Sequence, residues 1–168
     1  TTASIPIQSG APIPTWFGIG GPADRLLAVR SEQDIRRGLE IDPAARVLGD
    51  GANLLVDDDG VGELVLAMKG YDGVEYADGG VVVVQAGADL RKLIHETARL
   101  GLGGLEGLTG IPATVGGAAM MNAGGKFGQF ADAVRRVHAQ ALHADCAECE
   151  FRAVLQFARF AEHRGEFV

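Results

Sequence analysis

The chain has 168 residues, of which 47% are hydrophobic, and a formal net charge of −7. This length suits one ordinary domain or two small lobes, and the apolar fraction excludes a disordered chain. The negative charge argues against nucleic-acid binding, because phosphate contacts require clustered Lys and Arg.

The sequence also indicates where the protein works. No apolar run approaches the roughly 20 residues that span a bilayer, and the first residues lack a signal-peptide pattern. The two cysteines are too few for a disulfide framework, which favours a reducing compartment. We therefore expect a cytoplasmic protein without a membrane partner. Nothing in the sequence indicates an oligomeric state.

The first part of the chain predicts strands that alternate with one helix. Ser31 and Asp34 have the spacing of a weak capping box, so we expect a helix to begin there and to end before Pro43. Strands are expected at residues 25–29, 45–48 and 63–67, with a short buried piece at 54–56 and a turn at 57–60.

The second part predicts more strand than helix. We expect a hairpin between residues 73–76 and 81–85, and a helix that opens at Asp89 and stops at Gly101. Beyond it, residues 133–142 are expected to pair with 149–151, and residues 153–160 to form a short helix. Because strands are not each followed by a full helix, two α+β lobes (residues 1–68 and 69–168) fit better than a doubly wound sheet.

The glycine-rich segment 105–125 is a candidate ligand site. It is too glycine-rich to predict a helix and too apolar for a solvated linker. Glycine lets a backbone approach a ligand closely and present its N–H groups to phosphate or carbonyl oxygens. The lone amide Asn122 is suited to the polar edge of a ring. The alternative is a glycine-rich connection packed against a sheet, and composition alone does not separate the two.

Two shorter glycine motifs differ in what they predict. Residues 18–23 match the dinucleotide fingerprint, but Pro22 lies inside the motif and a strand-like run follows, so we reject that interpretation. Residues 48–55 follow a strand, and Gly49 and Gly51 leave successive N–H groups free for an anion. The alternative is a plain turn. Together with the later segment, this motif suggests two loops that hold one phosphorylated cofactor.

A metal site is the minority interpretation of the remaining motifs. Four metal-type side chains fall within a dozen positions, but His138 and His143 differ in strand parity, so a zinc-stabilised interaction domain is only an alternative hypothesis. His95 starts a zincin-like motif that fails because residue 99 is Arg, and we expect His95 on a helix surface. We predict no metal. The four side chains are His138, His143, Cys146 and Cys149.

Three segments taken together resemble one family. Residues 15–23, residues 48–55, and residues 110–117 with 122–124 occur in the order and spacing of the UDP-N-acetylenolpyruvoylglucosamine reductases. The resemblance covers essentially the whole chain but only about the first half to two-thirds of a family member. It implies a two-lobed α+β FAD-binding domain of the vanillyl-alcohol-oxidase type, without the family's C-terminal substrate domain.

The resemblance implies a redox function in peptidoglycan precursor synthesis. FAD would bind noncovalently between the lobes, and a hydride would pass from NADPH through the flavin to UDP-N-acetylenolpyruvoylglucosamine, giving UDP-N-acetylmuramate. The protein's part is orientation and charge stabilisation. The implied FAD-binding residues are Gly49, Asp50, Gly51, Ala52, Asn53, Leu54, Leu55, Thr109, Gly110, Ile111, Pro112, Thr114, Gly116, Gly117, Asn122 and Gly124.

The chain departs from the family in its catalytic residues. The family's Tyr-Arg stretch is absent, and Arg159 is the nearest candidate for the arginine that stabilises the developing enolate. The family's serine proton donor and late glutamate lie in a domain that this sequence does not include. A catalytically incomplete FAD-binding module that needs a missing domain or partner chain is therefore the alternative function.

Overall fold

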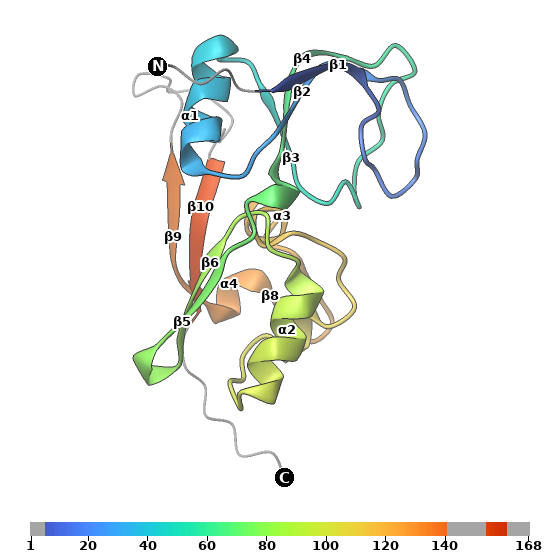
Figure 1. Ribbon diagram of the computed structural model, residues 1–168. Helices are drawn as coiled ribbons and strands as arrows, with labels where there is room; N and C mark the ends of the chain where they lie inside the picture. The colour runs from blue at the N-terminus through green and yellow to red at the C-terminus, as the bar shows by residue number, and fades with distance from the viewer. Residues whose placement is uncertain (1–5, 141–153, 161–168) are drawn as a thin grey trace, which may run out of the picture.

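The computed structural model describes residues 6–140 and 154–160, which form two four-stranded sheets and a small two-stranded one (Figure 1). The first sheet, sheet A, is built from strands within residues 7–67. The second, sheet B, is built from strands within residues 74–160. This agrees with the expected pair of α+β lobes, while the exact boundary after residue 68 stays a prediction.

Sheet A combines a parallel core with one antiparallel edge, in the order β1-β2-β4-β3. Strand β4 lies parallel to both β2 and β3, and β1 pairs antiparallel with β2. The expected strands are confirmed to within about two residues. These three are Ala23–Ala28 (β2), Arg46–Leu48 (β3) and Val61–Ala67 (β4), whereas β1 (Ile7–Ala11) was not expected.

Helix α1 (Glu32–Ile41) connects β2 to β3 and confirms the predicted capping box. The Ser31 hydroxyl accepts from the Asp34 N–H, and the Asp34 carboxylate accepts from the Ser31 N–H at 3.0 Å. Ile35 is fully buried against sheet A. Gly38 lets the helix come close to the sheet, since a Cβ there would lie 2.6 Å from a Leu66 methyl. The helix ends before Pro43, as expected.

Sheet B is antiparallel throughout, in the order β5-β6-β10-β9. The hairpin of β5 (Val74–Ala77) and β6 (Val81–Gln85) confirms the prediction. Strand β9 (Val134–Gln140) was also expected. The helix predicted over residues 153–160 is wrong, because this segment forms strand β10 (Val154–Phe160), which pairs on both sides with β6 and β9. Residues 149–151, the predicted partner strand, lie outside the described residues.

The helices of the second lobe cover sheet B. Helix α2 (Leu90–Arg99) begins at the predicted cap Asp89, whose carboxylate accepts from the Lys92 N–H, and His95 is exposed on it as expected. Single-turn 3₁₀ segments lie at Met68–Gly70 (η1), Asp78–Gly80 (η2) and Glu106–Leu108 (η3). The core contains Val82, Val84, Leu90, Leu93, Leu108, Val115, Ala118 and Phe130.

The glycine-rich segment contains regular structure, contrary to the sequence-based expectation. Helix α3 (Val115–Met120) includes two of its glycines, and the Thr114 side chain caps it. Packing explains the departure, because a Cβ at Gly116 would lie 2.8 Å from the Ala86 Cβ. This close approach offsets the low helix propensity of glycine. The segment continues into β7 (Gly124–Gly125), β8 (Gly128–Gln129) and α4 (Phe130–Ala133).

Two further features concern exposed or apolar segments. The prediction of a short buried segment at residues 54–56 is wrong, because the segment is irregular and Leu54 and Leu55 are 41% and 69% exposed.

Within the described part of the chain, no helix is long and apolar enough to cross a membrane.

Candidate functional site

Two loops of sheet A run side by side (Figure 1). Loop 12–22 joins β1 to β2, and loop 49–60 joins β3 to β4. The Trp16 N–H donates to the Gly51 carbonyl (3.2 Å), and the Gly21 N–H donates to the Asp57 carbonyl (2.8 Å). Gly51 has φ +66°, and a Cβ there would lie 2.6 Å from the Pro14 carbonyl oxygen. Only glycine permits this approach, so the two loops form one unit.

The Asp50 carboxylate ties this unit together. Oδ2 accepts from the Trp16 indole N–H at 2.8 Å, and Oδ1 lies 2.5 Å from the Lys69 ammonium. Asp50 follows β3 and Lys69 follows β4, and these parallel strands end at the same edge of the sheet. The carboxylate is only 16% exposed. Its two oxygens are therefore engaged by residues from two other segments.

Residues 49–55 present a run of unused backbone donors. Among the hydrogen bonds of the described residues, none is donated by a backbone N–H of this segment. Gly51 is buried, whereas Asn53, Leu54 and Leu55 are exposed. A succession of free N–H groups around a turn forms a concavity that favours anions, and buried N–H groups normally have a partner. This arrangement is compatible with the anion-binding interpretation of the motif, and Ala52 and Asn53 also form a turn, so the structure does not separate the two interpretations.

The second lobe reaches this loop through Thr114. A Cβ at Gly49 would lie 2.5 Å from the Thr114 Oγ1, so the Thr114 side chain occupies the space that a side chain at residue 49 would need. Thr114 is only 2% exposed, and its hydroxyl accepts from the Gly117 N–H at 3.2 Å. The two glycine-rich segments that the sequence paired are therefore adjacent in space.

The second segment has fewer free donors than the first. The Gly116 N–H donates to the Ala86 carbonyl at 2.8 Å, and the Gly117 N–H is held by Thr114. The Thr109 and Ile111 N–H groups also have partners within the chain, and Pro112 has none to give. Gly110 is the open position, with φ +89° and no atom within 4 Å of a Cβ. This segment therefore offers a ligand mainly backbone surface.

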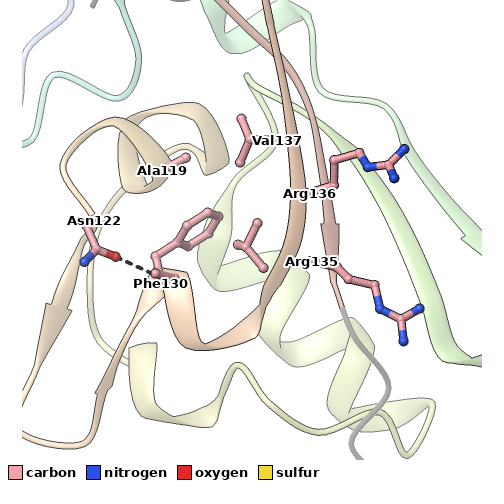
Figure 2. A pocket seen from close by; sticks show the side chains of 8 residues that line it. Ala119, Asn122, Phe130, Arg135, Arg136 and Val137 are labelled. Atoms are coloured by element: carbon pink, nitrogen blue, oxygen red, sulfur yellow. Dashed lines mark hydrogen bonds between the residues drawn. The ribbon is translucent and has the colours of Figure 1, made fainter.

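The Asn122 side chain forms hydrogen bonds within the chain. It is the only non-glycine residue with positive φ (+43°) in the described part of the chain. Its Nδ2 donates to the Gln129 Oε1 (3.0 Å), and its Oδ1 accepts from the Ala131 N–H (3.0 Å; Figure 2). Gly124 lies in β7, paired with Gln129. The Asn122 side chain thus links α4 to the β7–β8 hairpin, and both its polar atoms have partners within the chain.

Two shallow pockets adjoin Asn122. One of about 330 Å³ lies among α3, α4 and β9, and Arg135 and Arg136 extend away from Asn122 in Figure 2. Its lining is Ala119, Asn122, Phe130, Ala131, Val134, Arg135, Arg136 and Val137. The other, about 540 Å³, is formed by Asn122, Gly124, Gly125, Lys126, Gly128, Gln129 and Asp132.

The remaining sequence candidates lie in sheet B or outside the described residues. Arg159 is in β10, in register between Val83 of β6 and Arg136 of β9. His138 is in β9, whereas residues 143, 146 and 149 of the zinc hypothesis lie outside the described residues. The described ranges contain no group of three or more side chains arranged to hold a metal ion.

Comparison with known proteins decides the family. A model for a FAD binding domain matches residues 23–143, well over half of the chain. The chain belongs to the FAD-binding domain family. This family contains the fold expected from the sequence, and the predicted two-lobed FAD-binding fold is confirmed.

Individual relatives agree with the sequence resemblance. The FAD-binding chain is 47% identical over 137 residues to the UDP-N-acetylenolpyruvoylglucosamine reductase of Thermus thermophilus, which covers 80% of this chain and 49% of the relative. The crystal structure of the reductase from Thermus caldophilus matches with a TM-score of 0.75 and 34% identity, covering 95% of this chain and 62% of that one. The chain thus spans about half the length of the curated relatives it matches.

A more distant structure shows the fold alone. Cholesterol oxidase from B. sterolicum superposes with a TM-score of 0.67 at 18% identity, over 93% of this chain and 37% of that one.

The loops described above fit a dinucleotide in this FAD-binding fold. Residues 49–55 present free N–H groups, and Gly49 and Gly51 lie where a Cβ would collide with neighbouring atoms.

Sequence reasoning missed Lys69 and the Trp16 side chain as parts of the site. Trp16 belongs to the first of the three segments that resemble the family, but nothing in the sequence predicted its hydrogen bond to Asp50. Lys69 follows a strand with no motif around it. Only the parallel pairing of β3 with β4 brings it to Asp50.

Proposed function

We propose that this chain binds FAD noncovalently and forms the flavin-binding part of a UDP-N-acetylenolpyruvoylglucosamine reductase. The observation that carries the proposal is the run of free N–H groups at residues 49–55, in contact with Thr114 of the second lobe. The 47% identity to the Thermus thermophilus reductase supports the choice of substrate. Under this proposal the reaction takes place in the cytoplasm.

The loops divide the work of binding. The N–H groups of residues 49–55 would hold the negatively charged pyrophosphate, because successive backbone donors favour an anion. The Asp50 carboxylate is engaged by Trp16 and Lys69, so Asp50 would contact the pyrophosphate through its backbone N–H. The flavin and adenosine parts would lie along the second segment, beside Thr109, Gly110, Ile111, Pro112, Thr114, Gly116, Gly117, Asn122 and Gly124.

Bound FAD would supply hydride transfer between NADPH and the enolpyruvyl group of UDP-N-acetylenolpyruvoylglucosamine, the reduction that yields UDP-N-acetylmuramate. The protein contributes orientation and charge stabilisation. Arg159 is our candidate for stabilising the enolate, since a permanently charged guanidinium suits a developing oxyanion.

The test of FAD binding uses two glycine variants. Gly51→Ala places a side chain against the Pro14 carbonyl at a positive φ and should abolish FAD binding. Gly79→Ala is the matched control, because Gly79 has a similar φ (+74°) but no atom within 4 Å of a Cβ. Binding is measured by flavin fluorescence and turnover by substrate-stimulated NADPH oxidation. A protein that stays colourless when FAD is added refutes the proposal.

A second candidate function is an FAD-binding module that needs another domain or a partner chain for turnover. This sequence lacks the family's Tyr-Arg stretch, which favours this candidate. FAD binding without substrate-stimulated NADPH oxidation would support it. Sustained turnover by the chain alone would exclude it.

A further inference from the structure

A carboxylate lies inside the proposed anion-binding loop. Asp50 sits between Gly49 and Gly51, in the segment whose N–H groups are free. Its side chain is 16% exposed, so water screens it only in part. A negative charge at this position opposes the approach of a pyrophosphate, and the repulsion grows as the local dielectric falls. An uncompensated aspartate in this loop would therefore weaken the binding of an anion.

The structure compensates this charge from two directions. The Lys69 ammonium lies 2.5 Å from Oδ1, and the Trp16 indole donates to Oδ2 at 2.8 Å. The Lys69 side chain is 58% exposed, so it can be changed without opening the core. Trp16 is also anchored by its main chain, which donates to the Gly51 carbonyl. Both carboxylate oxygens are therefore turned to partners outside the loop.

We propose that Lys69 is a positioning residue for dinucleotide binding. It neutralises Asp50 and, with Trp16, holds the carboxylate away from the N–H groups of residues 49–55, so that these groups are available to a pyrophosphate. The inference rests on the proposed binding of FAD. It assigns to Lys69 an action through Asp50 and no contact with the phosphates.

The two possible actions of Lys69 predict different double variants. If Lys69 acts by compensating Asp50, removing the carboxylate makes the lysine dispensable. If Lys69 binds phosphate directly, its loss weakens binding whether or not the carboxylate is present. Asp50→Asn keeps an oxygen that can accept from the Trp16 indole, so this variant removes the charge and retains the shape.

The experiment titrates FAD, and separately ADP as a pyrophosphate probe without a flavin, into four proteins and the wild type. The variants are Lys69→Gln, Asp50→Asn, the double variant, and Lys92→Gln as a control for net charge. Lys92 lies on α2 in the second lobe. Lys69→Gln should weaken both ligands about tenfold, equivalent to ~1.4 kcal/mol. The loss should shrink at high salt, since screening weakens the exposed charge.

The remaining outcomes separate the two proposals. The double variant should bind within about threefold of Asp50→Asn, and Lys92→Gln should match the wild type. Circular dichroism melts establish that each variant is folded. If the wild type does not bind FAD, the proposed function fails and this inference with it. If the wild type binds but Lys69→Gln is unchanged, or the double variant is as weak as Lys69→Gln, only the positioning role is overturned.

Discussion

The contact between Gly49 and Thr114 predicts a strong coupling between the lobes. In Gly49→Ala the new methyl would lie 2.5 Å from the Thr114 Oγ1, whereas ordinary contacts begin at 3.4 Å, so about 1 Å of movement is needed. Thr114 is buried and caps α3, so rotating its hydroxyl away sacrifices the hydrogen bond from Gly117. Overpacking of this kind costs about 1–3 kcal/mol. We expect a loss of unfolding free energy near 2 kcal/mol.

The double variant makes this reasoning specific. Thr114→Ala alone should cost about 1 kcal/mol through the lost cap. In Gly49→Ala/Thr114→Ala the colliding oxygen is absent, and the Thr114 Cβ is 3.7 Å from the new methyl, an ordinary contact. The double variant should therefore be about as stable as Thr114→Ala, with a coupling energy near 2 kcal/mol between two sites far apart in sequence.

Urea unfolding followed by circular dichroism measures these free energies. Gly62→Ala is the control, because a Cβ there meets only the Asp24 carboxylate at 3.8 Å, and we expect a change below about 1 kcal/mol. FAD affinity should fall in Gly49→Ala and recover in the double variant. Strictly additive losses would refute the steric argument, since they would mean that the methyl and the hydroxyl do not meet.

Three further predictions concern single side chains. The Leu64 N–H donates to the Asp42 carboxylate at 2.9 Å, and this hydrogen bond is the largest influence holding the pKa of Asp42 below its usual 3.8. The stability that the ionised Asp42 contributes is therefore present above pH ~4 and is lost as the pH falls through the lowered pKa. Asp42→Asn should be less stable at pH 7 in urea and show a flatter acid limb; an unchanged limb contradicts this. Burial, and then the Glu96 carboxylate at 2.9 Å, raise the pKa of Tyr76 to about 12, so its contribution is present below pH ~10 and lost towards pH 12. An ultraviolet titration should show Tyr76 ionising well above an unfolded tyrosine, and loss of this late step in Tyr76→Phe assigns it. Trp16 is the only tryptophan of the chain and lies beside residues 49–51, so saturation with FAD should quench its emission; full emission at saturation would place the cofactor elsewhere.

Local signals predicted the parts of the fold that depend on local physics. Ser31 and Asp34 form their capping box because both hydrogen bonds lie within one turn. The hairpin of β5 and β6 follows from alternation around a glycine turn. The two glycine motifs were expected to hold one phosphorylated cofactor because glycine leaves backbone N–H groups accessible, and the contact of Thr114 with Gly49 shows that the two segments meet.

The errors arise where distant contacts override local preference. Residues 154–160 form a strand because β6 and β9 supply partners on both sides, which a short apolar run does not reveal. Helix α3 contains Gly116, despite the low helix propensity of glycine, because a side chain there would collide with Ala86. Lys69 reaches Asp50 only through the parallel pairing of two strands. In each case the deciding neighbour lies elsewhere in the sequence.

The place of β10 in sheet B has a consequence for how the protein is made. Among the strands of this sheet it is the last in the chain, yet it lies inside the sheet between β6 and β9. Until the ribosome has released it, β6 and β9 have open edges, and exposed edges pair readily with other chains. Sheet A needs only residues up to 67, so it can close much earlier in synthesis. The second lobe is thus completed late, and a nascent chain stalled before residue 154 would leave edges of β6 and β9 open to pairing with other chains.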